Sequence, residues 1–434
     1  MMKNRKLKLL LVFALLVGGV VFTVYTYNQP IVVRLGIFAG SNWDVPSGKT
    51  YEVIDEAIAA FEKENPNVQI EYDSGILKED YSLWLSNQIV QGNEPDVFVV
   101  LNEDFNTFSS LGVLKNLNSL VEEDQSFDTN KYYKSALDFG VYQEKQYALP
   151  FESNPTLMFV NKTLLEKEGI DIPSNEWTLD ELYTIAKQVT KDVDGDGKVD
   201  QYGCYDYDWL DSMFAHSVEL FDEDGQECYV GEDRVKESII YAKKLMDLHQ
   251  GETLTAEDFD KGKVAFSPMQ LSQYRTYKPY PWRVKKYSNF EWDCLKMPSV
   301  DANSGNSETS TMLLGMSSRT SHEDVAWKFL KKLSYDENTQ LHLIKNSQGI
   351  SPLRSVTESS ETIEAIQIEN EEGMVNLSML TDVMEDTASH SQFKKYESSR
   401  ALIDTRLQQI MMNSEDIDIA LIRLQKEINK YLKE

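Results

Sequence analysis

The sequence predicts an α/β fold: a mainly parallel sheet with helices on both faces. Short apolar runs rich in β-branched residues, such as IVVRLGIF at 31–38 and VFVV at 97–100, alternate with longer segments whose apolar residues recur at helical spacing. The chain has 434 residues, of which 41% are hydrophobic and 26% charged. That length and composition suit a globular protein with a large core and two or three domains.

The first three strands can be placed in order from the N-terminal side. Residues 31–38 predict the first strand, NPNVQIEYDSG a turn and the second, and QGNEPDVFVVLNEDF the third. A helix is expected around 81–90, and the helix after the first strand has one apolar face, formed by Val53, Ile54, Ala57, Ile58 and Phe61. Because ligands bind beyond the carboxyl ends of parallel strands, we expect the loops 38–44 and 102–105 at one rim.

The rest of the chain continues the same alternation. Residues 146–170 predict a crossing between two parts of the molecule, with strand-like segments around the polar FESNP. A helix is expected to begin near Thr178, which can form a capping box with Glu181. Further helices are expected near 233–249 and 322–334. A docked terminal helix is expected from its apolar side, formed by Ile417, Ile419, Leu421, Leu424, Ile428 and Leu432.

The N-terminus carries a signal for export or anchoring. Residues 1–8, MMKNRKLK, hold four basic residues and no acid, and sixteen uncharged residues follow. This pattern fits either a secretory signal or an uncleaved anchor at 9–27 with a cytoplasmic head at 1–8. We favour the anchor, because no small-x-small cleavage motif precedes Pro30 and no cysteine for lipid attachment lies nearby. In both cases the chain from about residue 30 onward is expected outside the cytoplasm.

The charge and the cysteines narrow the choice of partners. The net charge of −28 repels nucleic acid and anionic lipid surfaces, so nucleic acid is excluded as a partner. Neutral or cationic partners suit this charge, which can also serve solubility alone. The three cysteines, Cys204, Cys228 and Cys294, form no disulfide framework. Isolated buried thiols are expected rather than a bridge between Cys204 and Cys228.

Catalytic and nucleotide-binding motifs are not supported. SGKT at 47–50 resembles the end of a phosphate loop, but the glycine required upstream falls on Trp43. Asp44 would repel phosphate, and Pro46 lacks an N–H donor. The five histidines show no metal spacing, no Gly-x-Ser-x-Gly turn occurs, and pairs of carboxylates arise by chance among 71 acids. We therefore expect a protein that is not an enzyme.

Several segments occur in a characteristic order. They are AFEKENPNVQIEY, EPDVFVV, GVLKNLNSLV, QYALPFESNPTLMFVNKTLLEKEGI with EWTLDEL, DFDKGKVAFSPMQ, SSRTSHEDVAWKFLKKLS with NSQGISPLRS, and the terminal helix. In this order they resemble the extracellular solute-binding proteins of bacterial carbohydrate ABC importers, the family that includes maltose-binding protein. The resemblance covers nearly the whole exported part and is specific for fold and class, but weak for the ligand.

The resemblance implies a two-lobed clamp of the periplasmic-binding-protein type, with chain crossovers at a hinge. Lobe I would comprise 31–150 and 300–346, and lobe II would comprise 151–299 and 347–434. A carbohydrate, expected to be an oligosaccharide, would bind in the cleft, and hinge closure would present it to an ABC permease. The protein is expected to be a monomer that requires no cofactor. The alternative is a ligand-sensing ectodomain that reports to a membrane signalling protein.

Sugar sites combine planar polar groups with aromatic platforms. The loop after the first strand offers Ser41, Asn42, Trp43 and Asp44; alternatively, its polar residues only cap a turn and Trp43 fills the core. Glu152 matches the family's ligand carboxylate beside the hinge; alternatively, it is an exposed glutamate in a turn.

Other candidates also follow from the resemblance. Asn102 and Asp104 match a loop after a strand that contributes to ligand binding in the family; alternatively, they cap a helix. In lobe II, Trp209 matches an aromatic platform of the family, with Tyr207 as its neighbour; alternatively, these aromatic residues pack in the core. Met269 and Gln270 are also expected at the ligand, at a place where family members often carry a tryptophan. Tyr274 or Trp282 is therefore expected to supply the second platform.

The segment KDVDGDGKVDQYG, residues 191–203, fits part of a calcium loop. Asp192, Asp194, Asp196 and Asp200 occupy positions 1, 3, 5 and 9, and Gly197 stands at the sharp turn. Position 12, which should be a bidentate Glu, is Gly203. The segment is either a calcium site completed by a distant carboxylate or a hydrated turn held by Asx hydrogen bonds.

Overall fold

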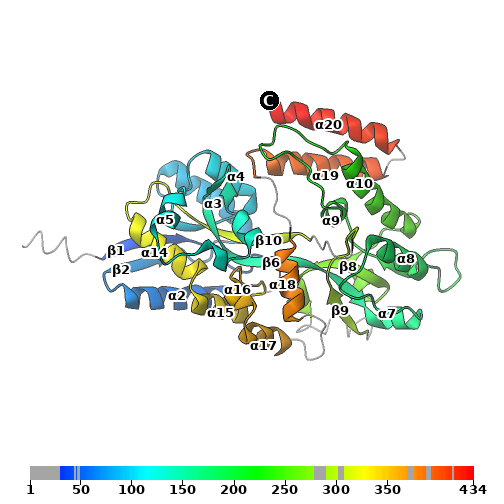
Figure 1. Ribbon diagram of the computed structural model, residues 1–434, viewed down its shortest axis with the longest axis horizontal. Helices are drawn as coiled ribbons and strands as arrows, with labels where there is room; N and C mark the ends of the chain where they lie inside the picture. Colours follow the sequence, from blue (N-terminus) through cyan, green and yellow to red (C-terminus); the bar gives the residue numbers. More distant parts are fainter. Residues whose placement is uncertain are drawn as a thin grey trace, which may run out of the picture.

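The structure is a computed structural model (Figure 1). It describes residues 30–43, 45, 49–277, 290–301, 307–368, 376–387, 392–412 and 415–434. Helices and strands alternate along most of this length, which confirms the predicted α/β class.

One mixed sheet runs through the molecule in the strand order β2-β1-β3-β10-β6-β8-β7, and β9 pairs with β6 off this path. The bounds are β1 Ile31–Gly36, β2 Val68–Tyr72, β3 Val97–Val100, β6 Ala148–Asn161, β7 Tyr202–Cys204, β8 Val264–Gln270, β9 Trp292–Leu295 and β10 Thr309–Met316. The strands at the two ends are parallel, β1 with β2 and β3, and β7 with β8. Strand β10 is antiparallel to both β3 and β6, and β6 is antiparallel to β8 and β9.

Strand β6 connects the two halves of the molecule. All of its fourteen residues are buried. Its first half, Ala148 to Pro155, pairs with β10, whereas Thr156 to Val160 pair with β8. We call the part built on β1, β2, β3 and β10 the first lobe, and the part built on β7, β8 and β9 the second lobe. Figure 1 shows these two bodies side by side with β6 passing between them.

Helices flank the sheet in both lobes. In Figure 1, α3 and α4 lie above the first-lobe strands, and α2 and α15 lie below them. The larger helices are α2 Thr50–Glu64, α3 Lys78–Gln91, α4 Asn102–Ser110, α8 Leu179–Val189, α9 Trp209–Ala215, α10 Asp233–Met246, α12 Leu271–Tyr277, α14 Glu323–Ser334, α15 Glu337–Asn346, α17 Ser360–Ile368, α18 Leu377–Glu385, α19 Tyr396–Met412 and α20 Ile417–Lys433. The shorter ones are α5 Asn118–Glu123, α6 Lys134–Asp138, α7 Lys162–Lys167, α11 Ala256–Asp260 and α16 Arg354–Thr357; β4 Val141–Tyr142 and β5 Lys145–Gln146 form a separate hairpin.

Local sequence signals explain several of these helices. Thr178 and Glu181 form the predicted capping box at the start of α8. The predicted helices near 233–249 and 322–334 are α10 and α14. The terminal helix α20 buries Leu421, Leu424 and Ile428, as the periodicity predicts, although Ile419 is half-exposed.

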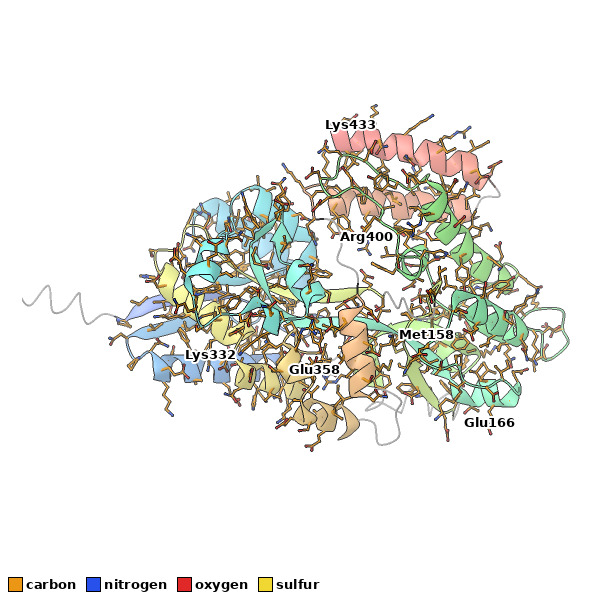
Figure 2. All side chains as sticks on the ribbon, in the orientation of Figure 1. Met158, Glu166, Lys332, Glu358, Arg400 and Lys433 are labelled. Carbon is orange, nitrogen blue, oxygen red and sulfur yellow. The ribbon has the colours of Figure 1, made fainter. Side chains whose placement is uncertain are left out.

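The buried apolar residues form four clusters. The largest fills the first lobe and draws on residues between Val33 and Phe151 and between Met312 and Val356. A second lies between the lobes around Phe159, Tyr274 and Ile350, and the other two fill the second lobe. In Figure 2, Lys332 marks α14 of the first lobe, and Arg400 marks α19 of the second.

Two further sequence expectations concern export. Cys204, Cys228 and Cys294 are all buried and no disulfide joins them, as expected from the sequence. Among the described residues, no helix combines the length and the apolar character needed to cross a bilayer. The predicted anchor at 9–27 lies outside the described residues.

Candidate functional site

A pocket opens at the rim of the first lobe, where β1 and β3 end. Its volume is ≈ 190 Å³. The loop after β1, the start of α4, the end of β8 and the start of β10 form its wall. The lining residues are Asn42, Trp43, Lys78, Val100, Leu101, Asn102, Glu103, Gln270, Ser310 and Met312. Four residues predicted from the sequence, Asn42, Trp43, Asn102 and Gln270, therefore meet in one place.

The loop after β1 is held by short-range and long-range bonds. The Ser41 hydroxyl accepts a hydrogen bond from the backbone N–H of Trp43 at 3.0 Å. From α3, Lys78 Nζ donates to the carbonyl oxygen of Asn42 at 2.6 Å. Trp43 is only 7% exposed and belongs to the first-lobe core. Its ring thus both fills the core and lines the pocket. Asp44 lies outside the described residues.

Glu152 is buried in β6 at the junction of the lobes, so it is not an exposed turn residue. Its Oε1 accepts hydrogen bonds from the Ser347 hydroxyl and, at 2.7 Å, from the backbone N–H of Gly349. Burial raises the pKa of Glu152, and the donors Ser347, Trp43 and Gly349 together with the charge of Arg275 oppose that rise. Protein donors therefore already occupy this carboxylate.

The Trp43 indole faces this carboxylate without completing a bond to it. Nε1 of Trp43 is buried and has no hydrogen-bond partner of ordinary geometry. It is nevertheless close enough to favour the charged form of Glu152. An unsatisfied buried donor costs free energy, so this N–H is a weak point in the packing around Glu152.

Asn102 and Asp104 point to different surroundings. Asn102 is the first residue of α4 and is exposed, while Leu101 occupies the N-cap position without a side-chain bond. Neither side chain therefore caps the helix. Asp104 accepts a hydrogen bond from Ser82 of α3 at 2.9 Å, and its other oxygen is buried without a partner. Burial raises the pKa of Asp104.

In the second lobe, Trp209 is a packing residue in this structure. It is 3% exposed, and its Nε1 donates to Asp404 of α19 at 3.0 Å. Tyr207 is half-buried, its hydroxyl is buried, and its ring packs edge-on against Tyr241 with centroids 6.1 Å apart. The core-packing alternative thus describes Trp209, whereas Tyr207 is only partly buried.

The end of β8 and the helix α12 that follows it supply one pocket residue and two packing residues. Gln270 lines the pocket; its Oε1 accepts from Asn154 at 2.9 Å and its Nε2 donates to Ser310 at 3.4 Å. Met269 packs against the core between the lobes. Tyr274 is 1% exposed and lies edge-on to Trp292, so its ring offers no stacking face here. Trp282 lies outside the described residues.

Sequence reasoning missed several buried polar residues that support the site. Asn154 donates to Gln270 and to the Ser272 hydroxyl, and its Oδ1 accepts from the Ser272 backbone N–H, each at 2.9 Å. Arg275 is 2% exposed and bonds the carbonyl oxygens of Ile344 and Gly349. Asn154 stands within the polar FESNP, which was the available signal. Nothing local marks Arg275.

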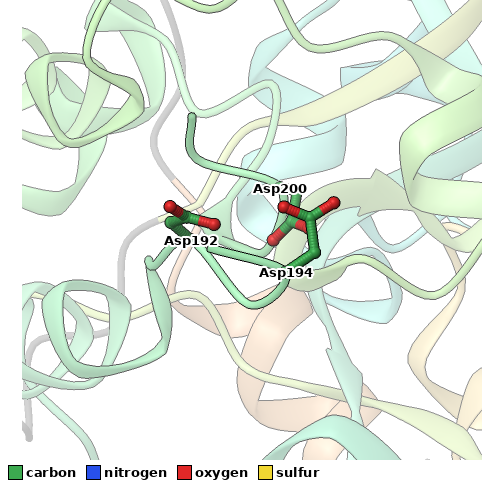
Figure 3. Close-up of side chains that lie close together, drawn as sticks. All are labelled: Asp192, Asp194 and Asp200. Carbon is green, nitrogen blue, oxygen red and sulfur yellow. The ribbon is translucent and has the colours of Figure 1, made fainter. Parts of the chain in front are cut away.

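No residue of the aspartate loop at 191–203 lines this pocket, and Figure 3 shows three aspartates of the loop close together. Carboxylate oxygens of Asp192, Asp194 and Asp200 lie within 4.8 Å of one another; Asp196 is not part of this group. Both oxygens of Asp192 accept backbone N–H bonds, from Gly195 at 2.6 Å and Gly197 at 2.7 Å. Such bonds suit a hydrated turn, while the closeness of the three carboxylates also fits a shared cation. The calcium site stays a prediction.

The glycine at position 12 of this loop has a packing reason. Gly203 lies in β7 against α8, and a Cβ there would meet the Ala186 Cα at 2.3 Å. A glutamate cannot replace it without moving the helix. A bound cation would therefore need its remaining ligands from other groups.

Solved structures share the fold of the chain. The sugar-binding protein MalE of Xanthomonas citri is 17% identical with a TM-score of 0.76, covering 93% of this chain and 97% of its own. The cyclic alpha-maltosyl-1,6-maltose binding protein of Arthrobacter globiformis is 16% identical with a TM-score of 0.76, covering 93% and 100%. An ABC substrate-binding protein of Listeria monocytogenes, solved with cycloalternan, is 19% identical with a TM-score of 0.71, covering 93% and 100%.

These neighbours are two-lobed, which confirms the predicted clamp-like fold. A family model described as bacterial extracellular solute-binding protein matches residues 46–340, which is more than half of the chain. The match runs from α2 through β10 and includes every lining residue of the pocket except Asn42 and Trp43. The chain belongs to the family of bacterial extracellular solute-binding proteins.

Proposed function

We propose that this protein captures a carbohydrate, most simply an oligosaccharide, and delivers it to an ABC import permease by closing its lobes. The N-terminal segment would hold it at the outer face of the cell membrane, raising its concentration near the permease. Family membership supports solute binding. The structural neighbours are named as a sugar-binding protein, a cyclic alpha-maltosyl-1,6-maltose binding protein and a substrate-binding protein in complex with cycloalternan, and these names support a sugar as the solute.

The observation that carries the proposal is the convergence of Asn42, Trp43, Asn102 and Gln270 on one pocket. Three of these side chains are amides, which both donate and accept hydrogen bonds, as sugar hydroxyls do. The fourth is an indole, whose apolar face suits the flat face of a sugar ring. Ser310 adds a hydroxyl, and Lys78 adds an ammonium group to the same wall.

The origin of these residues supports closure on a ligand. Asn42, Trp43 and Asn102 come from the first lobe, whereas Gln270 ends β8, which pairs with the second half of β6. A ligand that bonds both sides gains contacts only when the lobes stand at the right separation. It would therefore shift the population toward the closed state by its differential affinity for that state.

Binding can be tested with a defined panel. Isothermal titration calorimetry of the exported part with maltotriose, cycloalternan and cyclic maltosyl-maltose is expected to find one sugar bound with a low-micromolar Kd or tighter, about −8 kcal/mol. Asn102→Ala and Asn42→Ala should each weaken that sugar about tenfold, roughly 1.4 kcal/mol, by removing hydrogen bonds to it. Asn130→Ala is the matched control, because Asn130 is an exposed asparagine bonded within its own turn to Asp128.

Three results would count against the proposal. Binding of no sugar from a broad panel would remove the carbohydrate. If chromatography of the calorimeter sample shows that the sugar has been cleaved, the protein is an enzyme. Equal loss of affinity in Asn102→Ala and Asn130→Ala would place the ligand somewhere else.

A further inference from the structure

A buried polar group joins three segments at the junction of the lobes. Glu152 of β6 is 4% exposed and accepts from the Ser347 hydroxyl and the Gly349 N–H. Arg275 of α12 is 2% exposed and donates to the carbonyl oxygens of Gly349 at 2.8 Å and Ile344 at 2.9 Å. Gly349 thus uses its N–H toward the glutamate and its carbonyl toward the arginine.

The two charged residues come from different parts of the fold. The turn 347–350 follows α15, which packs against α2 of the first lobe. Helix α12 follows β8 directly and packs in the cluster between the lobes. The backbone of Ile350 also pairs with Ser153 of β6, with both N–H to O distances at 2.8 Å. The turn 347–350 is therefore hydrogen-bonded both to β6, which connects the lobes, and to α12, the helix that follows the second-lobe strand β8.

Close packing fixes the position of the glutamate. A Cβ on Gly349 would meet Oε1 of Glu152 at 2.4 Å. Only glycine allows the backbone to approach the carboxylate so closely. Because Glu152 and Arg275 have almost no water access, removing either one leaves the Gly349 backbone group that it bonds buried without that partner, which costs free energy. Lobe rotation that preserved this group would avoid that cost.

The same group touches both sides of the pocket. The Trp43 indole faces Glu152 from the first-lobe side. Arg275 lies on the helix that begins immediately after the pocket residue Gln270. A change in the position of the first-lobe wall therefore reaches Glu152 through Trp43, and a change at Gln270 reaches Arg275 along helix α12.

We propose that Glu152 and Arg275 are positioning residues of the hinge. They hold the turn 347–350 as a fixed pivot between the lobes and set the separation of the lobes at rest. Glu152 then acts on the ligand through Trp43 and the pivot, not by binding it. This inference rests on the proposed clamp motion, but it concerns the protein without sugar and can fail independently.

Distances between spin labels test the pivot. Labels are placed on cysteines introduced at Val90 of α3 and Gln188 of α8, which are exposed helix positions in different lobes. The native cysteines are buried, and burial raises the pKa of the Cys204 and Cys228 thiols, so they resist labelling. Pulsed electron–electron double resonance then gives the distribution of distances between the two labels in the absence of sugar.

Glu152→Gln and Arg275→Met are expected to shift or broaden this distribution relative to the parent protein. The control is Glu94→Gln. Glu94 is likewise buried and bonded to an arginine, Arg319, and to a serine, Ser317, but all three lie within the first lobe. Glu94→Gln should lower thermal stability and leave the distance distribution unchanged. Unchanged distributions in Glu152→Gln and Arg275→Met would overturn the proposal and leave both residues a structural role alone.

A second set of variants keeps the test decisive if Arg275→Met does not fold. Gly349→Ala should displace Glu152 and shift the lobe distances in the parent protein. In a Glu152→Ala background the clash is absent, so Gly349→Ala should have little further effect on distances or melting temperature. Equal effects of Gly349→Ala in both backgrounds would refute the contact. Failure of sugar binding would leave all of these sugar-free measurements intact, so the two proposals fail separately.

Discussion

Replacement of Asn154 by alanine should destabilise the protein and weaken its ligand site together. Asn154 is fully buried, and its amide makes three hydrogen bonds of 2.9 Å, two to Ser272 and one to Gln270. Alanine removes all three and leaves the backbone N–H of the fully buried Ser272 without its acceptor. With about 0.5–1.5 kcal/mol for each of the three net hydrogen bonds, the loss is roughly 2–4 kcal/mol.

The same strand provides a matched control for this variant. Asn161 ends β6, is 1% exposed and also makes three bonds, to the carbonyls of Gly262 and Val264 and from the Leu164 N–H. Asn161→Ala should therefore cost a similar ~2–4 kcal/mol. It lies at the far end of β6 from Gln270, so it should leave ligand affinity unchanged.

Urea unfolding and titration calorimetry separate the two effects. Both variants should unfold at lower urea concentration than the parent protein. Only Asn154→Ala should also raise the Kd for the sugar identified by the panel, because Gln270 loses the donor that orients it. The reasoning is refuted if Asn154→Ala is as stable as the parent or if Asn161→Ala weakens the sugar equally.

Three other predictions follow from separate features. Burial raises the folded-state pKa of Asp104, so the native state keeps this proton at pH values where the unfolded chain has lost it, and stability falls as pH rises from about 4 through the folded pKa. Asp104→Asn should remove this fall and raise the melting temperature at pH 7. A lower melting temperature of the variant at pH 7 would contradict the prediction. If the loop 192–200 is the predicted calcium site, added Ca²⁺ should raise the melting temperature of the parent protein but not of Asp194→Asn, whereas no rise in the parent identifies a hydrated turn. An uncleaved anchor at 9–27 predicts a full-length product in the membrane fraction, and intact-mass spectrometry showing loss of the N-terminal segment would identify a cleaved signal.

The local sequence was sufficient for the classes and many boundaries of the elements. Alternating apolar runs and amphipathic segments depend on neighbours a few residues away, so β1, α2, β2, α3 and β3 follow from them. The capping box at Thr178 is equally local. The pocket was also partly predictable, because the rule for the carboxyl ends of parallel strands placed the loops of Trp43 and Asn102 at one rim.

The environment of each site residue was decided by the tertiary structure. Glu152 could be read as a free ligand carboxylate because its donors, Ser347 and Gly349, are 195 and 197 residues away in sequence. Trp209 could be read as a platform because its partner Asp404 is 195 residues away. Residue types and their periodicity indicate which side chains are stabilised by burial or require hydrogen-bond partners. They do not state which distant groups satisfy them, since close packing brings those groups together only when the whole chain has folded.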